Sequence, residues 1–207
     1  MPGPVTVIVM PAVELPLFPL GTVLYPGGVL PLRIFEPRYL DMVGNCLRQG
    51  TGFVVVALSE GHEAGSETIA FHALGTRAEI VDFDQLEDGM LGLTCRGAER
   101  LRVTRHRVRP DRLILANLAM PEPEPAQAVG ADHRPLAEFL RELLDRDEAE
   151  PYRRWLQEDW SDAGWLGFRL AELLPLPLEL KVHLLELSDP ERRLDILATI
   201  LRDNRLL

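Results

Sequence analysis

The stretch LRIFEPRY, residues 32–39, changes pattern at its centre, where an apolar run gives way to charged residues around a proline. Pro37 suits the first position of a helix, where a missing N–H costs no hydrogen bond. Glu36 would then lie at the positive end of the helix dipole, which favours a carboxylate. The stretch predicts a change from strand to helix. Its polar residues belong either to a binding or catalytic site or to a structural corner.

Strand-like segments lie on both sides of this corner. VELPLFPL (residues 13–20) is apolar and contains two prolines, which is typical of an edge strand, and VLPLRIF (29–35) has a strand pattern. Apolar residues then recur every three to four positions from Tyr39 to Leu47, which predicts a helix that ends near Gly50. Further strands are predicted at residues 53–58, 70–82, 90–95, 101–108 and 112–120, with a polar loop at 60–67 and a hairpin turn at 87–89.

The rest of the chain has a different organisation. PEPEPAQAVGA (residues 121–131) is proline-rich, acidic and without periodicity, which predicts a linker. From residue 132 to residue 207 the apolar positions follow helical spacing, with helix caps predicted at Asp162 and at Ser188 or Asp189. We therefore expect an α+β protein with an antiparallel barrel or curled sheet in residues 1–120 and a helical subdomain in residues 132–207.

Composition and charge argue against several classes of protein. The formal net charge of −10 argues against a general nucleic-acid binder, which needs clustered positive charge. The N-terminus lacks the positive region of a signal peptide, and prolines and glycines interrupt the uncharged run at residues 15–32, so we expect no membrane span. We expect a soluble, cytoplasmic protein in which Cys46 and Cys95 are buried thiols.

No pattern in the sequence predicts catalysis. A P-loop needs a lysine after its glycines, and Lys181 is the only lysine of the 207 residues. The Gly-x-Ser-x-Gly elbow is also absent, and a serine–lysine dyad would have to recruit Lys181 from a predicted helix. The histidines are scattered, without the spacing of zinc ligands. We therefore predict no enzyme activity, no metal and no cofactor.

Arginines cluster between residues 96 and 112, where Glu99 and Asp111 are the only acids. Charged and apolar residues alternate around residues 100–103, which predicts a strand with one solvated face. The arginines could form that solvated face, pair with the acidic helical half of the chain, or bind an anionic ligand or RNA. No aromatic residues are interleaved for base stacking, which weakens the RNA alternative. The candidate anion-binding residues are Arg100, Arg102, Arg105 and Arg107.

Three blocks of the sequence carry a family resemblance. They are ELPLFPLGTVLYPGGVLPLRIFEPRYLDMV (residues 14–43), GTRAEIVDFDQLEDGMLGLTCRGAERLRV (75–103) and LLPLPLELKVHLLELSDPERRLDIL (173–197). In this order they resemble the N-terminal substrate-binding domain of Lon proteases, with a departure at GAERLRV, where the family usually has an aromatic after the arginine. The resemblance implies a PUA-like β-barrel with one inserted helix and a helical subdomain behind it. It also implies that Ile34 and Phe35 plug the barrel and that Glu36 and Arg38 satisfy nearby polar groups.

The resemblance also implies a function. Full-length Lon adds an ATPase module and a serine–lysine protease domain, and this sequence has the motifs of neither. We therefore expect a non-catalytic polypeptide-binding module, an adaptor or holding factor for unfolded or damaged segments. Its partners would be polypeptide segments or a separate protease or chaperone, and a homo-oligomer is left open.

The candidate peptide-binding residues surround the YPGG turn. This turn would place large apolar side chains at a loop tip, where they could form an apolar groove for extended peptides, or Tyr25 could instead pack on the barrel. The alternative function is a PUA-like protein that binds RNA or another anion through the arginine cluster. The peptide-binding candidates are Leu24, Tyr25, Pro26 and Phe35.

Overall fold

The computed structural model describes residues 14–59 and 70–207. Two segments lie outside the described residues: the polar loop predicted at residues 60–67, and residues 1–13, where the sequence lacks the positive region of a signal peptide. The first part of the chain holds six strands and one helix, where seven strands and one helix are predicted. They are β1 (Glu14–Leu20), β2 (Val29–Ile34), α1 (Pro37–Gln49), β3 (Phe53–Leu58), β4 (Phe71–Gln85), β5 (Leu91–Val108) and β6 (Ile114–Ala119).

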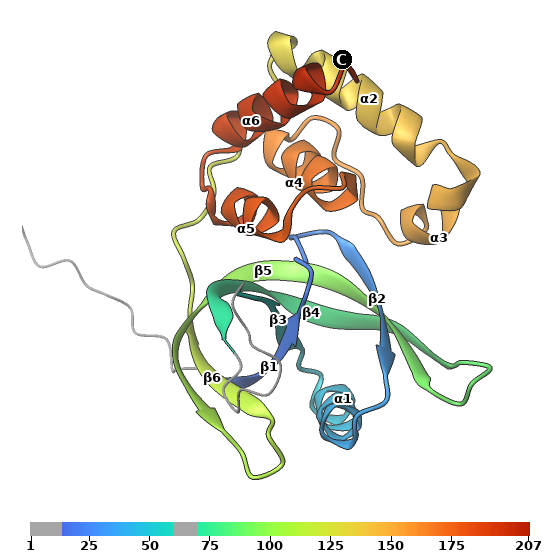
Figure 1. The fold of residues 1–207 in the computed structure, drawn as a ribbon, viewed down its shortest axis with the longest axis vertical. Helices are drawn as coiled ribbons and strands as arrows, with labels where there is room; N and C mark the ends of the chain where they lie inside the picture. The colour runs from blue at the N-terminus through green and yellow to red at the C-terminus, as the bar shows by residue number, and fades with distance from the viewer. Residues whose placement is uncertain (1–13, 60–69) are drawn as a thin grey trace, which may run out of the picture.

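The six strands form one sheet, in which five strands close into a ring and β2 pairs with β5 alone. Their order is β2-β5-β4-β3-β1-β6, and an additional pairing between β5 and β6 closes it. The neighbours are antiparallel except for β1 and β3, which are parallel, so the prediction of a purely antiparallel sheet is wrong at this one pair. Parallel neighbours need a crossover connection, and β2 with α1 provides it (Figure 1).

Strand β1 has partners on both sides, although its prolines predict an edge strand. Residues 14–17 pair with β6, and residues 17–20 pair with β3. Pro16 lies in the first half and Pro19 in the second, so each proline lies where only one neighbour is paired. A proline cannot donate to a ladder, and this change of partner halfway along the strand accommodates both prolines.

The corner at residues 32–39 forms as predicted, with one exception. Helix α1 begins at Pro37, and Ile34 is buried in the barrel interior. Arg38 lies 2.7 Å from the Glu36 carboxylate and donates to the carbonyl of Arg112 at 3.0 Å, while its Nε is buried without a hydrogen-bond partner among the described residues. Phe35 does not plug the barrel, because its side chain is 67% exposed. The chain turns towards the helix at this residue and leaves the ring in solvent.

Strand β5 is one long element, although two strands are predicted in its place. Its first half pairs with β2 and its second half with β6, while β4 lies along most of its length. Gly97 lies at the change of partner and exchanges backbone hydrogen bonds with the turn after Tyr25, at 2.7 Å to Gly27 and 2.9 Å to Gly28. The glycine allows this close approach instead of ending the strand.

The second part of the chain is helical. Two predicted N-caps are confirmed, because Asp162 accepts from the backbone of Trp165 and Asp189 accepts from the backbone of Arg192. No helix among the described residues is long and apolar enough to cross a membrane. The helices are α2 (Arg134–Leu144), α3 (Glu150–Arg153), α4 (Ala163–Leu173), α5 (Leu178–Glu186) and α6 (Pro190–Asp203), with 3-10 turns η1 (Ala131–His133) and η2 (Asp147–Ala149).

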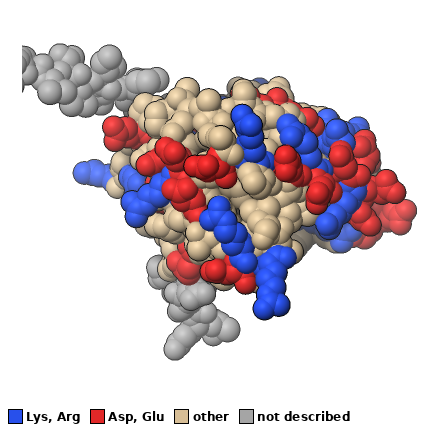
Figure 2. Space-filling view, turned by 90° about the horizontal axis from the view of Figure 1, so that it is seen from above, with Lys and Arg blue, Asp and Glu red and all other residues tan. Residues whose placement is uncertain are grey.

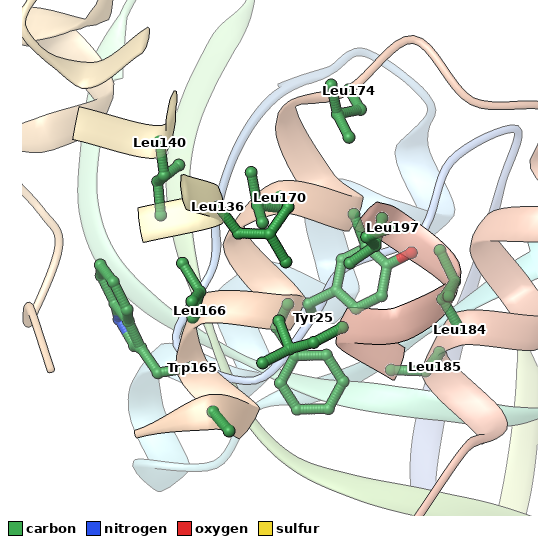
Figure 3. Close-up of a cluster of buried hydrophobic side chains, with 14 of the residues drawn as sticks. Tyr25, Leu136, Leu140, Trp165, Leu166, Leu170, Leu174, Leu184, Leu185 and Leu197 are labelled. Atoms are coloured by element: carbon green, nitrogen blue, oxygen red, sulfur yellow. The ribbon is translucent and has the colours of Figure 1, made fainter. Parts of the chain in front are cut away.

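The helices lie over one end of the barrel, opposite α1 (Figure 1). Their leucines form the largest apolar cluster of the molecule, and Tyr25 from the barrel lies among them (Figure 3). A separate cluster fills the barrel beneath α1 and contains Cys46 and Cys95, which are both free and buried as predicted. Burial raises the pKa of the Cys95 thiol to about 12.

Candidate functional site

The YPGG turn is buried between the barrel and the helices. Tyr25 has no exposed surface, Leu24 is also buried, and the Tyr25 hydroxyl donates to the carbonyl of Lys181 in α5 at 2.8 Å. The prediction that these side chains are exposed at a loop tip is therefore wrong. The turn is a loop tip of the barrel, but the helical region covers it and uses Tyr25 as part of its own core.

The two glycines of this turn let it approach a buried ion pair of α4. Arg169 donates to the carbonyl of Pro26 at 2.9 Å, and Glu172 accepts from the backbone of Val29 at 3.0 Å. A Cβ atom on Gly28 would lie 2.5 Å from the Glu172 carboxylate. Burial raises the pKa of Glu172, although the guanidinium of Arg169, at 3.0 Å, opposes that shift. This arrangement joins the barrel to the helices.

The four predicted peptide-binding residues do not come together. Leu24 and Tyr25 are buried, and Pro26 lies at the helical end of β2. Phe35 lies at the opposite end of β2, beside α1 (Figure 1). A six-residue strand spans about 20 Å, so Pro26 and Phe35 cannot contact one short ligand together.

The four predicted anion-binding arginines also lie in different environments. Arg100 is buried and donates to the carbonyls of Leu185 and Leu187 at 2.8 and 2.9 Å, so it pairs with the helical half of the chain. Burial lowers the pKa of Arg100. Arg107 donates twice to Glu14, at 2.8 Å each. Arg102 and Arg105 are exposed on β5. The four candidates therefore do not form one anion site.

Arg100 belongs to a cluster that links the linker to the helices. Glu124 accepts two hydrogen bonds from Arg193 of α6, at 2.7 and 2.8 Å, and lies 3.4 Å from Arg100. Arg193 is fully buried and also donates to the carbonyl of Leu184 at 2.9 Å. Its guanidinium lies 3.9 Å from the ring centre of Phe168. The predicted linker is thus anchored at Glu124.

We call residues 121–127 the strap. Pro121, Glu124 and Gln127 are half-buried, and the residues between them are exposed. A period of three is that of polyproline II, which the three prolines of this segment favour. The strap runs from the end of β6 to the helices (Figure 1) and has one face on the protein.

A groove of about 730 Å³ lies between the strap, the barrel and α4. Pro26, from the predicted peptide set, and Arg100, from the predicted anion set, both line it. Carboxylates, prolines and aromatic rings supply most of the remaining wall. The other lining residues are Gly27, Glu99, Met120, Pro121, Glu122, Pro123, Glu124, Pro125, Ala126, Gln157, Asp162, Gly164, Trp165 and Phe168.

Trp165 is the lining residue with an unmet hydrogen-bonding requirement. Its indole Nε1 is buried and has no hydrogen-bond partner within the described residues. The ring packs edge-on against Trp160, with 4.9 Å between the ring centres, and lies at the margin of the leucine cluster (Figure 3). An indole N–H can only donate, and Nε1 has almost no exposed surface, so a peptide carbonyl would satisfy it after a small shift of the ring.

The groove has the chemistry of a binding site. Its described lining holds no serine, cysteine, histidine or lysine, so it offers no nucleophile next to a base. No group of three potential metal ligands occurs among residues 14–59 and 70–207. Apolar rings with a few polar groups are typical of a site that binds a ligand without changing it.

Sequence reasoning missed Trp165, Phe168 and Met120 as groove residues. Trp165 and Phe168 fit the apolar stripe of a helix, and nothing in their spacing distinguishes a core residue from a groove residue. The signal that could have found the groove is the proline-rich segment, because regularly spaced prolines suit a docked polyproline II segment as well as a free linker.

Comparisons with known proteins agree with this architecture. The profile of the family described as the ATP-dependent protease La (LON) substrate-binding domain matches residues 14–203. A crystal structure of a Lon N-terminal domain protein from Xanthomonas campestris is 39% identical, with a TM-score of 0.72, over 90% of this chain and 98% of that one. The N-terminal domain of Lon protease from Mycobacterium avium complex shares the fold, with 18% identity, a TM-score of 0.58 and coverage of 89% and 95%.

Among whole proteins, the Lon protease of Brevibacillus choshinensis is 23% identical over 201 residues. The alignment covers 93% of this chain and 25% of that protein, so the chain spans about a quarter of the length of this Lon protease. The family profile covers nearly all the described residues, and the fold agrees with the solved relatives. The chain therefore belongs to the family of Lon substrate-binding domains.

Proposed function

We propose that this chain is a non-catalytic module that binds extended polypeptide segments in the groove between the strap and α4. The observation that carries the proposal is Trp165, whose buried indole N–H has no partner on the wall of a largely apolar groove. Apolar burial would provide affinity, and the indole would orient the ligand by donating to a peptide carbonyl. Family membership supports a polypeptide ligand.

The exposed residues of the groove support the same proposal. Met120 is 64% exposed at the end of β6 and lines the groove together with the strap. A flexible thioether adapts to side chains of different shapes, which suits a site that accepts many sequences. We propose that Pro26 contacts the ligand, and that Leu24 and Tyr25 support the site from below without contacting it.

The wider role that we propose is that of an adaptor or holding factor. Bound segments would be held intact or passed to a separate protease or chaperone, because the described lining of the groove offers no nucleophile next to a base. The helical face carries interspersed positive and negative side chains (Figure 2), a pattern that does not favour nucleic acid on that face.

Fluorescence anisotropy with a labelled, chemically unfolded casein tests the site. Met120→Glu should weaken binding about tenfold, because a carboxylate replaces an apolar contact. Val108→Glu is the matched control, since Val108 is 60% exposed but lies outside the groove lining, and it should bind like the original chain. Equal weakening by both variants, or none by Met120→Glu, would place the ligand elsewhere. Intact casein after the assay is expected, and fragments would overturn the non-catalytic role.

A further inference from the structure

We propose that the groove is selective for proline-containing segments in the polyproline II conformation that carry basic residues. This inference rests on the proposed function and specifies its ligand class. Three features of the groove support it: the free donor of Trp165, the absence of backbone donors at the prolines of the strap, and the sign of the charges around the opening.

The first feature is the indole of Trp165. A carbonyl that precedes proline belongs to a tertiary amide and has no N–H beside it to satisfy. A single indole donor next to apolar rings therefore matches an X–Pro unit, in which the carbonyl accepts and the proline ring packs on an aromatic face. Phe168 and Trp165 supply aromatic surface at the same groove.

The second feature is the wall made by the strap. Pro121, Pro123 and Pro125 have no backbone N–H, so every second residue of this wall offers no backbone donor to a ligand. A ligand in the polyproline II conformation makes no backbone hydrogen bonds of its own, so it does not need backbone donors from this wall. The chain's own strap shows the three-residue period of the same conformation along the groove.

The third feature is charge complementarity. Glu99, Glu122, Glu124 and Asp162 all line the groove, but Glu99 pairs with Arg77 and Glu124 with Arg193, so the carboxylates without an ion-pair partner among the described residues are Glu122 and Asp162. Arg100 is the one cation in the described lining, and its donors are used by the carbonyls of α5 and by Glu124. Glu122 is exposed on the strap and has no ion-pair partner among the described residues. The opening therefore favours a ligand with lysine or arginine next to its prolines.

The test uses three labelled peptides of equal length with the full chain, measured by anisotropy. One is basic and proline-rich, the second has alanine in place of every proline, and the third is acidic and proline-rich. We expect the first to bind at least about tenfold more tightly than the other two. Equal affinity for the proline and alanine peptides overturns the conformational selectivity, and equal affinity for the basic and acidic peptides overturns the charge selectivity.

Two substitutions assign the selectivity to the groove. Trp165→Phe keeps an aromatic ring but removes the donor, and it should reduce the preference for proline over alanine, whereas Trp155→Phe, outside the groove, should not. Glu122→Lys should reverse the preference between basic and acidic peptides, and Glu138→Lys on exposed α2 surface should leave it unchanged. Glu122 is exposed, so this variant remains informative if Trp165→Phe fails to fold. An unchanged charge preference in Glu122→Lys overturns the inference.

Casein and the three peptides separate a loss of selectivity from a loss of binding. If unfolded casein binds and is weakened by Met120→Glu, but the three peptides bind equally, the groove binds polypeptides without the selectivity inferred here. If neither casein nor any peptide binds, the proposed function itself is wrong. RNA that competes with the basic peptide at the groove would also contradict the inference, because the charge preference would be reversed.

Discussion

Glu124 of the strap and Arg193 of α6 form a bidentate ion pair, with N–O distances of 2.7 and 2.8 Å, although 69 residues separate them in the sequence. Arg193 is fully buried, and the side chain of Glu124 is 15% exposed. Because Arg100 of the barrel approaches the same carboxylate at 3.4 Å, this one side chain joins the strap, the barrel and the last helix.

Removing the carboxylate should destabilise the whole chain. Glu124→Ala leaves Arg193 buried without its acidic partner, and breaking such a pair costs about 3–5 kcal/mol. Glu122→Ala is the control on the same strap, and its exposed side chain should change the free energy of unfolding by less than about 0.5 kcal/mol. Urea denaturation measures both. Equal, small changes would mean that Glu124 does not anchor the strap.

Tyr25 should be a stability residue and not a ligand contact. Tyr25→Phe removes the hydrogen bond to Lys181 and should cost about 1 kcal/mol, because the carbonyl loses its donor. Tyr25→Ser also removes a buried ring and should cost about 3–5 kcal/mol. Thermal melting of both variants tests whether Tyr25→Ser is more destabilising than Tyr25→Phe. A Tyr25→Ser protein that melts normally but no longer binds casein would restore Tyr25 as a contact residue.

Gly28 should not tolerate a side chain. Gly28→Ala places a methyl group 2.5 Å from the Glu172 carboxylate, so this carboxylate must shift away from the backbone N–H of Val29, and melting should occur at a lower temperature. Gly21→Ala is the matched control, since a Cβ atom there has no neighbour within 4 Å among the described residues. If the two variants melt alike, the turn does not pack against Glu172 as described.

The acid dependence of stability should include a contribution from Arg77. Its hydrogen bond holds the pKa of Glu99 below the ordinary value of 4.5, and it lowers the pKa of Glu79 in the same way. The stabilisation is therefore present above pH 4.5 and is lost as the pH falls through the lowered pKa values of the folded protein. Arg77→Met should lower the melting temperature at about pH 7 and have little effect at about pH 2. If the difference in melting temperature between Arg77→Met and the original chain were the same at both pH values, the ion pairs would not be its source.

The parts of the fold that depend on local chemistry could be predicted from the sequence. Pro37 and the caps Asp162 and Asp189 act on their own helix ends, so their residue types are sufficient to predict the boundaries. The order of strands and helices follows from periodicity for the same reason. The continuity of β5 through Gly97 could not be predicted, because a glycine in a strand can end it or allow a close approach, and only the packed turn decides between these.

The candidate site could not be predicted in this way because it is assembled from distant segments. The burial of Tyr25 depends on Lys181, which lies 156 residues further along the chain. The same holds for Arg100, whose partners Leu185 and Leu187 lie in the helical region. Exposure and burial of these side chains depend on how the helices dock on the barrel, which no local pattern encodes.

Mapping of a bound client by photo-crosslinking tests the central claim most directly. An unfolded casein carrying photoreactive groups would be irradiated with the chain, and the crosslinked residues would be located by mass spectrometry. Crosslinks are expected at the groove, on Met120, the strap and Gln157, which lie together in its lining. Crosslinks concentrated instead at Phe35 and Phe83, the exposed aromatic residues of the barrel, would contradict the account.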